Sequence, residues 1–228
     1  MSELNIYKSQ LSDEEITRGL HREWVGGLWD ELGLWQYDRL VNDFGLQPSM
    51  RLLDLGCGSF RAGVKLIPYL DKGNYYGIDV NESLIEAGLQ HEIAHAGLAD
   101  RISRDQILVC DDFDASSFGV KFDIIWALSV WTHLSLNHIQ FCLHNAMRVL
   151  ADEGVFYASV FVPTDNHEVL APSRHEPGGI VSYRARDPYH VTDDDISHVV
   201  KQLPYPVIWR RIGDFAHPRG QQLLEFRK

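Results

Sequence analysis

The stretch RLLDLGCGSFRAG, residues 51–63, decides the expected fold. Its leucines are typical of a strand that is buried on both faces, as in a parallel sheet. Asp54 interrupts this run, and a buried carboxylate is costly unless a partner compensates it. Gly56 and Gly58 permit a sharp turn and let a ligand approach the backbone. The apolar residues after the turn have helical spacing: Phe60, Val64 and Ile67. A strand, a glycine-rich turn and a helix in succession predict a small-molecule site.

The composition limits the class of protein. A chain of 228 residues with 45% hydrophobic residues can bury a full core, so we expect one domain over residues 1–228. The net charge of −11 argues against a nucleic-acid surface. Cys57, Cys110 and Cys142 lack metal-type spacing, and such a sparse, odd number suits a reducing compartment. The N-terminal stretch is polar, and no apolar run approaches the ~20 residues that span a bilayer. We therefore expect a soluble cytoplasmic protein without membrane contact.

Strands and helices alternate from residue 51 onward. The hydrophobic patterns predict strands at 51–55, 74–79, 105–110, 122–129, 154–162, 206–212 and 221–227, and helices at 59–70, 82–97, 136–150 and 193–203. Such alternation predicts an α/β fold, a Rossmann-like, doubly wound and mostly parallel seven-stranded sheet with helices on both faces.

Four segments follow from these patterns. Residues 1–48 are expected to form an N-terminal helical cap, broken or kinked at Gly26-Gly27. Residues 49–162 form the expected cofactor-binding core. Residues 163–191 contain four prolines and no periodicity, which indicates a lid or substrate insertion. Residues 192–228 supply the last helix and strands, and Thr192 with Asp195 resembles a capping box.

Acidic residues follow three successive predicted strands: Asp54, Asp79 and the pair Asp111-Asp112. Ligands of open α/β sheets bind beyond the carboxyl ends of the strands. A carboxylate after the second strand suits the two hydroxyls of a ribose. A nicotinamide site fits less well, because a G-x-G-x-x-G pattern from Gly56 would need glycine where Arg61 stands, and Asp54 would face pyrophosphate. A cofactor with a cationic amine and no phosphate, such as S-adenosylmethionine, suits these acids better.

Four stretches, LLDLGCGSF, YYGIDV, VCDDF and FDIIWALSV, resemble the successive motifs of class I S-adenosylmethionine-dependent methyltransferases. The resemblance covers about residues 50–162. It implies that the glycine-rich turn holds the methionine part, Asp79 the ribose and Val80 the adenine. It also implies that Leu128 and Ser129 border the transferred methyl group. The implied cofactor-binding residues are Asp54, Gly56, Cys57, Gly58, Asp79, Val80, Asp112, Phe113, Leu128 and Ser129. Many relatives have a third glycine where this chain has Phe60, so we expect a tighter turn there.

Histidines and arginines outside these motifs are the candidates for handling a methyl acceptor. His133 follows the fourth strand of the core, and His217 lies between the last two strands, so either could act as general base. Arg184, Arg186, His190 and Arg219 could bind a polar, anionic or sugar-like acceptor. The resulting hypothesis is a methyltransferase that acts on a small molecule by in-line displacement.

Other interpretations of the chain remain open. The domain could bind the nucleoside as a non-catalytic scaffold or sensor, or it could methylate nucleic acid, although it lacks a basic stripe. HEIAH at 91–95 matches a zinc-protease signature, but its helical context predicts a surface histidine pair and no metal site. The acceptor, the methylated atom and the oligomeric state are not predicted.

Overall fold

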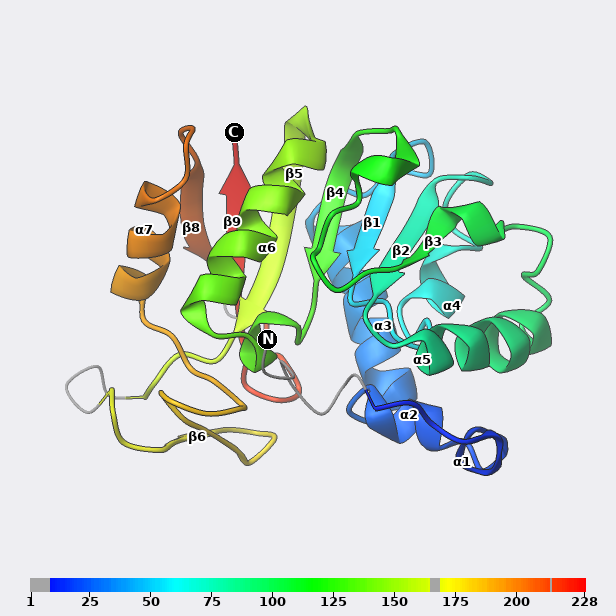
Figure 1. Ribbon diagram of the computed structural model, residues 1–228, viewed down its shortest axis with the longest axis horizontal. Coiled ribbons are helices and arrows are strands. Elements are labelled where there is room, and N and C mark those ends of the chain that lie inside the picture. Colours follow the sequence, from blue (N-terminus) through cyan, green and yellow to red (C-terminus); the bar gives the residue numbers. More distant parts are fainter. Residues whose placement is uncertain (1–8, 165–168, 214) are drawn as a thin grey trace. The chain divides into compact units, whose positions relative to one another are not determined.

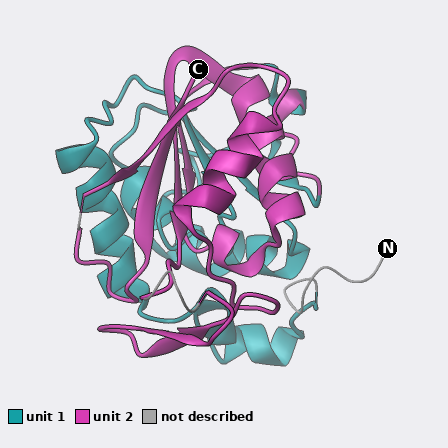
Figure 2. Ribbon diagram, turned by 90° about the vertical axis from the view of Figure 1, so that its left-hand side faces the viewer, with its two compact units in different colours: residues 1–111, 117–119 teal, residues 112–116, 120–228 magenta. Residues whose placement is uncertain are grey.

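The computed structural model describes residues 9–164, 169–213 and 215–228. Its strands form a seven-stranded sheet in the order β3-β2-β1-β4-β5-β9-β8. The predicted mostly parallel α/β sheet is therefore confirmed. The chain divides into two compact units, coloured separately in Figure 2. Unit 1 comprises residues 1–111 and 117–119, and unit 2 comprises residues 112–116 and 120–228. That all 228 residues act as one domain stays a prediction.

Unit 1 contains three parallel strands: β1 (Leu52–Leu55), β2 (Tyr75–Asp79) and β3 (Ile107–Val109). The leucines of β1 are at most 2% exposed, as the apolar run predicted. Because Leu52 pairs with Tyr75 and Leu55 with Ile78, the two strands end side by side. This register places the glycine-rich turn after β1 next to the acid that ends β2.

One helix of unit 1 is much shorter than predicted. Helix α4 covers only Gly63–Leu66, whereas the sequence predicted 59–70. The cause is Phe60, whose φ of 66° is left-handed and cannot belong to a right-handed helix. Helix α5 (Glu82–Ala87) continues through a π-helical segment, η3 (Gly88–Ile93), close to the predicted 82–97. A short 3₁₀ turn, η4 (Arg104–Gln106), leads into β3.

The N-terminal segment forms α1 (Asp13–Thr17), α2 (Leu20–Trp24), α3 (Trp29–Asp38) and the π-helical η2 (Arg39–Asp43). The predicted break at Gly26-Gly27 is confirmed, since both glycines have positive φ values of 91° and 60°. A second break at Gly19, φ 79°, separates α1 from α2. The expected helical cap is thus a chain of short helices joined at glycines.

Unit 2 is built around β4 (Phe122–Ala127), β5 (Leu150–Val160), β8 (Ile208–Ile212) and β9 (Gln222–Arg227), with β4 and β5 parallel and the β5–β9 and β8–β9 pairs antiparallel. Unit 2 also contains helices α6 (Leu136–Val149) and α7 (Asp193–Lys201) (Figure 1). Strand β5 begins immediately after α6, four residues earlier than predicted. Trp126, Trp131, Phe156 and Phe226 are almost fully buried, so aromatic rings fill much of this core.

The proline-rich excursion contains a small hairpin that the sequence did not predict. Strand β6 (Ser173–His175) pairs antiparallel with β7 (Ile180–Ser182). Residues 165–168 of the excursion lie outside the described residues. The predicted capping box of α7 is confirmed, because Asp195 N donates to Thr192 Oγ1 over 3.2 Å and Thr192 N donates to Asp195 Oδ2 over 2.7 Å. Two 3₁₀ turns, η5 (Ser116–Phe118) and η6 (Trp131–His133), precede β4 and α6 respectively.

Candidate functional site

The glycine-rich turn after β1 is folded as its residues require. Gly56 and Gly58 have φ values of 83° and 52°, in the region that only glycine adopts readily. The amides of Gly56 and Cys57 both donate to the Ile78 carbonyl, over 2.8 and 3.1 Å. These bonds join the turn to β2. The Cys57 side chain is buried, and burial raises the pKa of its thiol well above the usual value, so it is an unreactive packing residue.

Asp79 fixes the same turn from the end of β2. Its Oδ2 accepts a hydrogen bond from Gly58 N over 2.8 Å, and its Oδ1 accepts one from Asn81 N over 2.8 Å. Burial raises the pKa of this carboxyl, while the backbone donors at Asn81, Gly58 and Val80 oppose the rise. The predicted ribose ligand therefore also has a structural task, which the sequence analysis did not foresee. Val80 follows it, half-buried, at the start of the connection to α5.

Asp54 is a buried acid whose pKa is raised. Its side chain is 4% exposed and accepts a hydrogen bond from the Tyr75 hydroxyl over 2.7 Å. Burial raises its pKa to about 6, the Tyr75 hydrogen bond opposes this rise, and the negative charge of Asp79 adds to it. The positive charge of Arg61 acts in the opposite direction, and a further cation beside Asp54 would likewise favour its ionised form.

A cap loop, residues 20–28, lies against this turn. The Arg61 guanidinium donates from Nη1 to the carbonyls of Val25 and Gly27, over 2.7 and 2.9 Å. A methyl carbon built on Gly58 would lie 2.6 Å from Cγ1 of Val25. The cap loop therefore packs directly on the glycine that the family resemblance assigns to ligand contact.

The HEIAH segment holds this cap loop through its glutamate. Glu92, buried to 7% exposure, accepts from Arg22 Nε and Nη2 over 2.7 Å each and contacts His21 Nε2 at 2.7 Å. The His91 ring lies 5.9 Å from the His21 ring and 6.0 Å from the His95 ring, centroid to centroid. Within the described ranges, no cluster of three or more histidines, cysteines or acids has the arrangement of a metal site.

Two of the predicted cofactor-binding residues, Asp112 and Phe113, belong to unit 2. Asp112 is exposed; its carbonyl accepts from Asn145 Nδ2 over 2.7 Å, and its Oδ1 accepts from Asp114 N over 3.1 Å. Phe113 has a left-handed φ of 61°, and its ring packs edge-on against Phe141 at 6.4 Å. Both residues are thus held by contacts with helix α6, from Asn145 and Phe141.

Ser129, at the end of β4, joins a buried polar cluster. Its backbone has a left-handed φ of 59°, and its amide donates to Ser159 Oγ over 2.6 Å. Ser159 Oγ donates to Gln221 Oε1 over 2.6 Å, and Gln221 Nε2 donates to Ser129 Oγ over 2.9 Å. The preceding Leu128 is buried. Sequence reasoning missed Ser159 and Gln221, because nothing local marks residues that meet only in the folded sheet.

His133 and Asp187, 54 residues apart, are hydrogen bonded. His133 Nδ1 lies 2.6 Å from Asp187 Oδ1, and the two side chains are 25% and 31% exposed. Tyr189 N donates to the Thr132 carbonyl over 2.6 Å, so the excursion touches the β4 end at two successive residues. The structure thus brings one predicted base together with a carboxylate that sequence reasoning missed.

The other predicted acceptor residues of the excursion have different surroundings. Arg184 is paired with both carboxylate oxygens of Asp195. His190 is 1% exposed, with Nδ1 2.9 Å from Ser182 Oγ and Nε2 2.7 Å from the Val169 carbonyl. Only Arg186 is exposed, with its guanidinium 3.9 Å from the centre of the Tyr183 ring. In this structure, Arg184 and His190 hold the excursion in place.

His217 and Arg219 lie in the loop before β9. His217 is 3% exposed, and its Nδ1 accepts from Arg219 N over 3.0 Å. This loop packs on the turn of the β6–β7 hairpin: a methyl carbon on Gly178 would lie 2.7 Å from Arg219 Cα, and one on Gly220 would lie 2.4 Å from the Glu176 carbonyl oxygen. Two segments predicted to border the acceptor are therefore neighbours.

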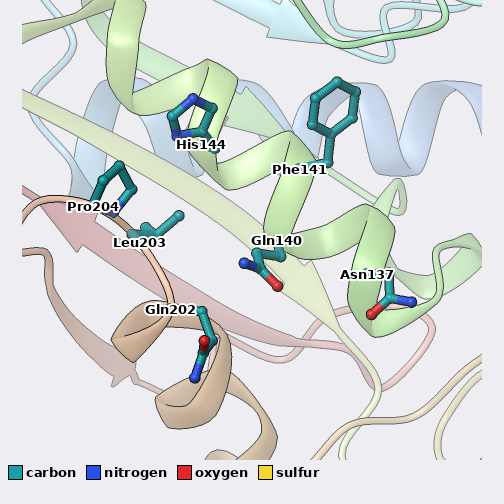
Figure 3. Close-up of a pocket in the computed structure, with 7 residues that line it drawn as sticks. All are labelled: Asn137, Gln140, Phe141, His144, Gln202, Leu203 and Pro204. Atoms are coloured by element: carbon teal, nitrogen blue, oxygen red, sulfur yellow. The ribbon is translucent and has the colours of Figure 1, made fainter.

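Unit 2 also has two shallow hollows. One of ≈290 Å³ is lined by Asn137, Gln140, Phe141, His144, Gln202, Leu203 and Pro204, from α6 and the segment after α7 (Figure 3). It contains no predicted site residue. The other, of ≈200 Å³, is lined by Leu134, Ser135, Leu136, Asn137, Arg184, Tyr189, His190 and Val191.

Comparison with known proteins agrees with this geometry. A family model described as "Methyltransferase domain" matches residues 53–156, from within β1 through most of β5. Residues 53–156 are therefore similar to this methyltransferase domain family. The match contains the cofactor motifs identified in the sequence and excludes the excursion and the last two strands.

Individual relatives of this methyltransferase domain are distant. A sterol 24-C-methyltransferase of Yarrowia lipolytica is 26% identical over 138 residues, which are 60% of this chain and 34% of that enzyme. The CcbJ methyltransferase of Streptomyces caelestis has a TM-score of 0.66 at 13% identity, covering 99% of this chain and 98% of the other. Magnesium protoporphyrin IX methyltransferase of Synechocystis PCC 6803, solved with bound S-adenosylmethionine, has a TM-score of 0.55 at 16% identity, with 98% and 88% covered. At these identities the solved structures establish the fold.

In the part of the chain that the structure describes, no helix has the length and apolar composition needed to cross a bilayer.

Proposed function

We propose that this chain transfers a methyl group from S-adenosylmethionine to a small polar acceptor. The observation that carries the proposal is the buried Asp54, whose pKa is raised to about 6 beside Asp79 and the glycine-rich turn. The cationic amine of the cofactor's methionine part would attract the carboxyl groups of Asp54 and Asp79, which otherwise repel each other. The glycines of the turn leave room for it to approach. Phosphate-containing cofactors would meet two acids instead.

The cofactor-binding residues would be those of the sequence analysis. Asp54, Gly56, Cys57 and Gly58 would hold the methionine part, and Asp79 the ribose diol. Val80, Asp112 and Phe113 would contact the adenine. Leu128 and Ser129 would border the methyl group. Bound S-adenosylmethionine supplies a methyl group on a positively charged sulfur, which leaves as a neutral thioether when the acceptor's electron pair takes the methyl carbon.

This chain's own residues would then position the acceptor and remove its proton. An in-line displacement needs alignment more than covalent help from the protein, and alignment can supply much of the rate. His133 is the better candidate for the base, because it is partly exposed whereas His217 is buried. Its Nε2 would take the proton that an acceptor hydroxyl or ammonium group releases.

The acceptor class is proposed from unit 2. Arg186 on Tyr183 offers an exposed cation and an aromatic face, and Arg219 lies in the loop that packs against the hairpin. These groups suit a polar, anionic or sugar-like molecule. The net charge of −11 disfavours nucleic acid as the acceptor. The cytoplasm fits three cysteines that are all free.

Two measurements test the proposal. Calorimetry with S-adenosylhomocysteine should show binding to the wild type and at least tenfold weaker binding to Asp54→Asn. Incubation with S-adenosylmethionine and a metabolite mixture should then yield a methylated product by mass spectrometry. Binding without any product would favour a scaffold or sensor, and absence of binding would refute the cofactor.

A further inference from the structure

The segment around Asp187 is a closed loop, residues 183–190, within the excursion. Tyr183 N donates to the Pro188 carbonyl over 2.8 Å, and His190 N donates to the Tyr183 carbonyl over 3.1 Å. These bonds close the loop at its base. Asp187 therefore stands on a short and internally bonded structure, although the sequence around it has no helical or strand periodicity.

The loop is fixed to the rest of unit 2 at three places. Tyr189 N donates to the Thr132 carbonyl over 2.6 Å, and Val191 N donates to the Phe161 carbonyl over 2.9 Å. Arg184 pairs with Asp195 at the start of α7, where Nη2 and Oδ1 are 2.6 Å apart. The contact between Asp187 and His133 therefore does not have to hold the loop in place.

The His133 end of this contact is equally well fixed. His133 ends the η6 turn, in which Thr132 Oγ1 donates to the Ser129 carbonyl over 3.0 Å. Trp131, which begins this turn, is 1% exposed and packs on Phe156 at 5.6 Å. The histidine thus projects from a rigid turn that directly follows the residue assigned to the methyl-donor side.

We infer that Asp187 is a positioning residue for His133: its carboxylate holds the proton on Nδ1 and leaves the basic lone pair on Nε2. A carboxylate accepts hydrogen bonds and cannot donate one when ionised, so the nitrogen that faces it must carry the proton. The same carboxylate stabilises the imidazolium that forms when His133 removes the acceptor's proton. The inference rests on the proposed methyl transfer.

The other charged or titratable side chains near the loop have partners of their own. Arg184 is neutralised by Asp195, and Arg186 stacks on Tyr183. His138, in the first turn of α6, contacts Ser135 Oγ through Nδ1 at 2.7 Å, and burial lowers its pKa. His133 Nδ1 lies 2.6 Å from the Asp187 carboxylate, close enough for this acid to hold its proton.

The experiment compares Asp187→Asn with Asp195→Asn in the full-length protein. The first variant keeps a hydrogen-bond acceptor but removes the charge next to His133. The second weakens the other anchor of the loop, at Arg184, and does not touch His133. Long-range ¹H–¹⁵N correlation spectra of histidine-labelled protein report the tautomer and pKa of each ring, with the His133 signal assigned from its loss in His133→Asn.

We expect the wild type to show the Nδ1-protonated tautomer of His133. Asp187→Asn should shift the ring toward the Nε2-protonated tautomer, because the amide can donate to Nδ1 and no longer requires a proton there. Asp195→Asn should lower the melting temperature and leave the His133 tautomer unchanged. With an acceptor found by the product screen, kcat should fall about tenfold in Asp187→Asn and not in Asp195→Asn, because the basic lone pair is then less often on Nε2.

A His133 ring protonated on Nε2 in the wild type, or a tautomer population that is the same in Asp187→Asn and wild type, would overturn the inference. A kcat that is unchanged in Asp187→Asn would do the same. Failure of the proposed function is seen separately, because calorimetry with S-adenosylhomocysteine tests donor binding without involving His133.

Discussion

The two units present their predicted site residues in different ways. In unit 1, Asp54, Gly56, Gly58 and Asp79 lie on two adjacent strand ends and are joined by backbone hydrogen bonds. In unit 2, side chains from the β4 end, the excursion and the loop before β9 meet through contacts that span 54 and 92 residues of sequence. A turn between two adjacent strands can be recognised from a short sequence motif. A site that is assembled from distant loops leaves no such motif. The arrangement of the residues proposed for the cofactor can therefore be predicted from sequence, whereas that of the residues proposed for the acceptor cannot.

The largest expected effect is at Gly58. Gly58→Val should reduce S-adenosylhomocysteine affinity more than about 100-fold, because a side chain is strained at this φ and would collide with Val25. Calorimetry measures the affinity, and circular dichroism checks that the sheet persists.

A double variant separates the two causes of this loss. Val25→Ala removes the atom that lies 2.6 Å from a methyl carbon on Gly58. If Gly58→Ala with Val25→Ala binds as weakly as Gly58→Ala alone, the turn itself meets the ligand. Full recovery in the double variant would show that the glycine only makes room for the cap loop, and the cofactor assignment of Gly58 would fail.

Asp79→Ala should have the next largest effect. It removes the acceptor for the amides of Gly58 and Asn81 as well as the proposed ribose contact. We expect a loss of about 2–3 kcal/mol in donor binding and a lower melting temperature, since unsatisfied buried donors cost about 1–3 kcal/mol. Asp79→Asn, which still accepts one hydrogen bond, should regain part of the stability. Unchanged calorimetric affinity in Asp79→Ala would remove this residue from the site.

The pH dependence of donor binding tests Asp54. Its pKa of about 6 lies above the usual 3.8, so the unliganded fold favours the protonated form and loses stability as pH rises through this interval. A cationic ligand needs the carboxylate instead. Affinity should therefore rise about tenfold per pH unit up to about pH 6 and level off above it.

Titration calorimetry between pH 5 and 7 measures this slope, with proton release visible in buffers of different ionisation enthalpy. Asp54→Asn serves as the control, and its binding should be weak and nearly independent of pH in that range. A wild-type affinity that is flat across the same range would mean that Asp54 is already ionised or does not face the ligand.

The sheet could be predicted because its strands are continuous apolar runs. The turn could be predicted because two closely spaced glycines after a strand indicate a backbone with positive φ values. The failures have physical causes as well. Helix α4 starts late because Phe60 takes a backbone conformation that its residue type disfavours. The β6–β7 hairpin is too short for a periodic signal, at three residues per strand. Asp187, Ser159 and Gln221 acquire their partners only in the folded chain, so no local pattern could mark them.

Phe60 gives the smallest expected effect on donor binding, and it tests how far the motif tolerates change. Its φ of 66° is a conformation that glycine adopts without strain, in agreement with the third glycine that the family resemblance leads us to expect here. The ring is fully buried, and the missing side chains of Gly63 and Gly88 make room for it: methyl carbons there would lie 2.9 Å from Phe60 Cβ and 2.5 Å from Cδ2.

Phe60→Gly would relieve about 1 kcal/mol of backbone strain but remove a ring whose burial contributes about 3–5 kcal/mol. We therefore expect a net loss of about 2–4 kcal/mol in the free energy of unfolding by urea titration, with donor affinity within about threefold of the wild type. A loss of affinity as large as that of Asp79→Ala would instead mean that the packed ring of Phe60 shapes the turn for its ligand. In that case packing of the ring would do in this chain what the backbone freedom of a glycine does elsewhere.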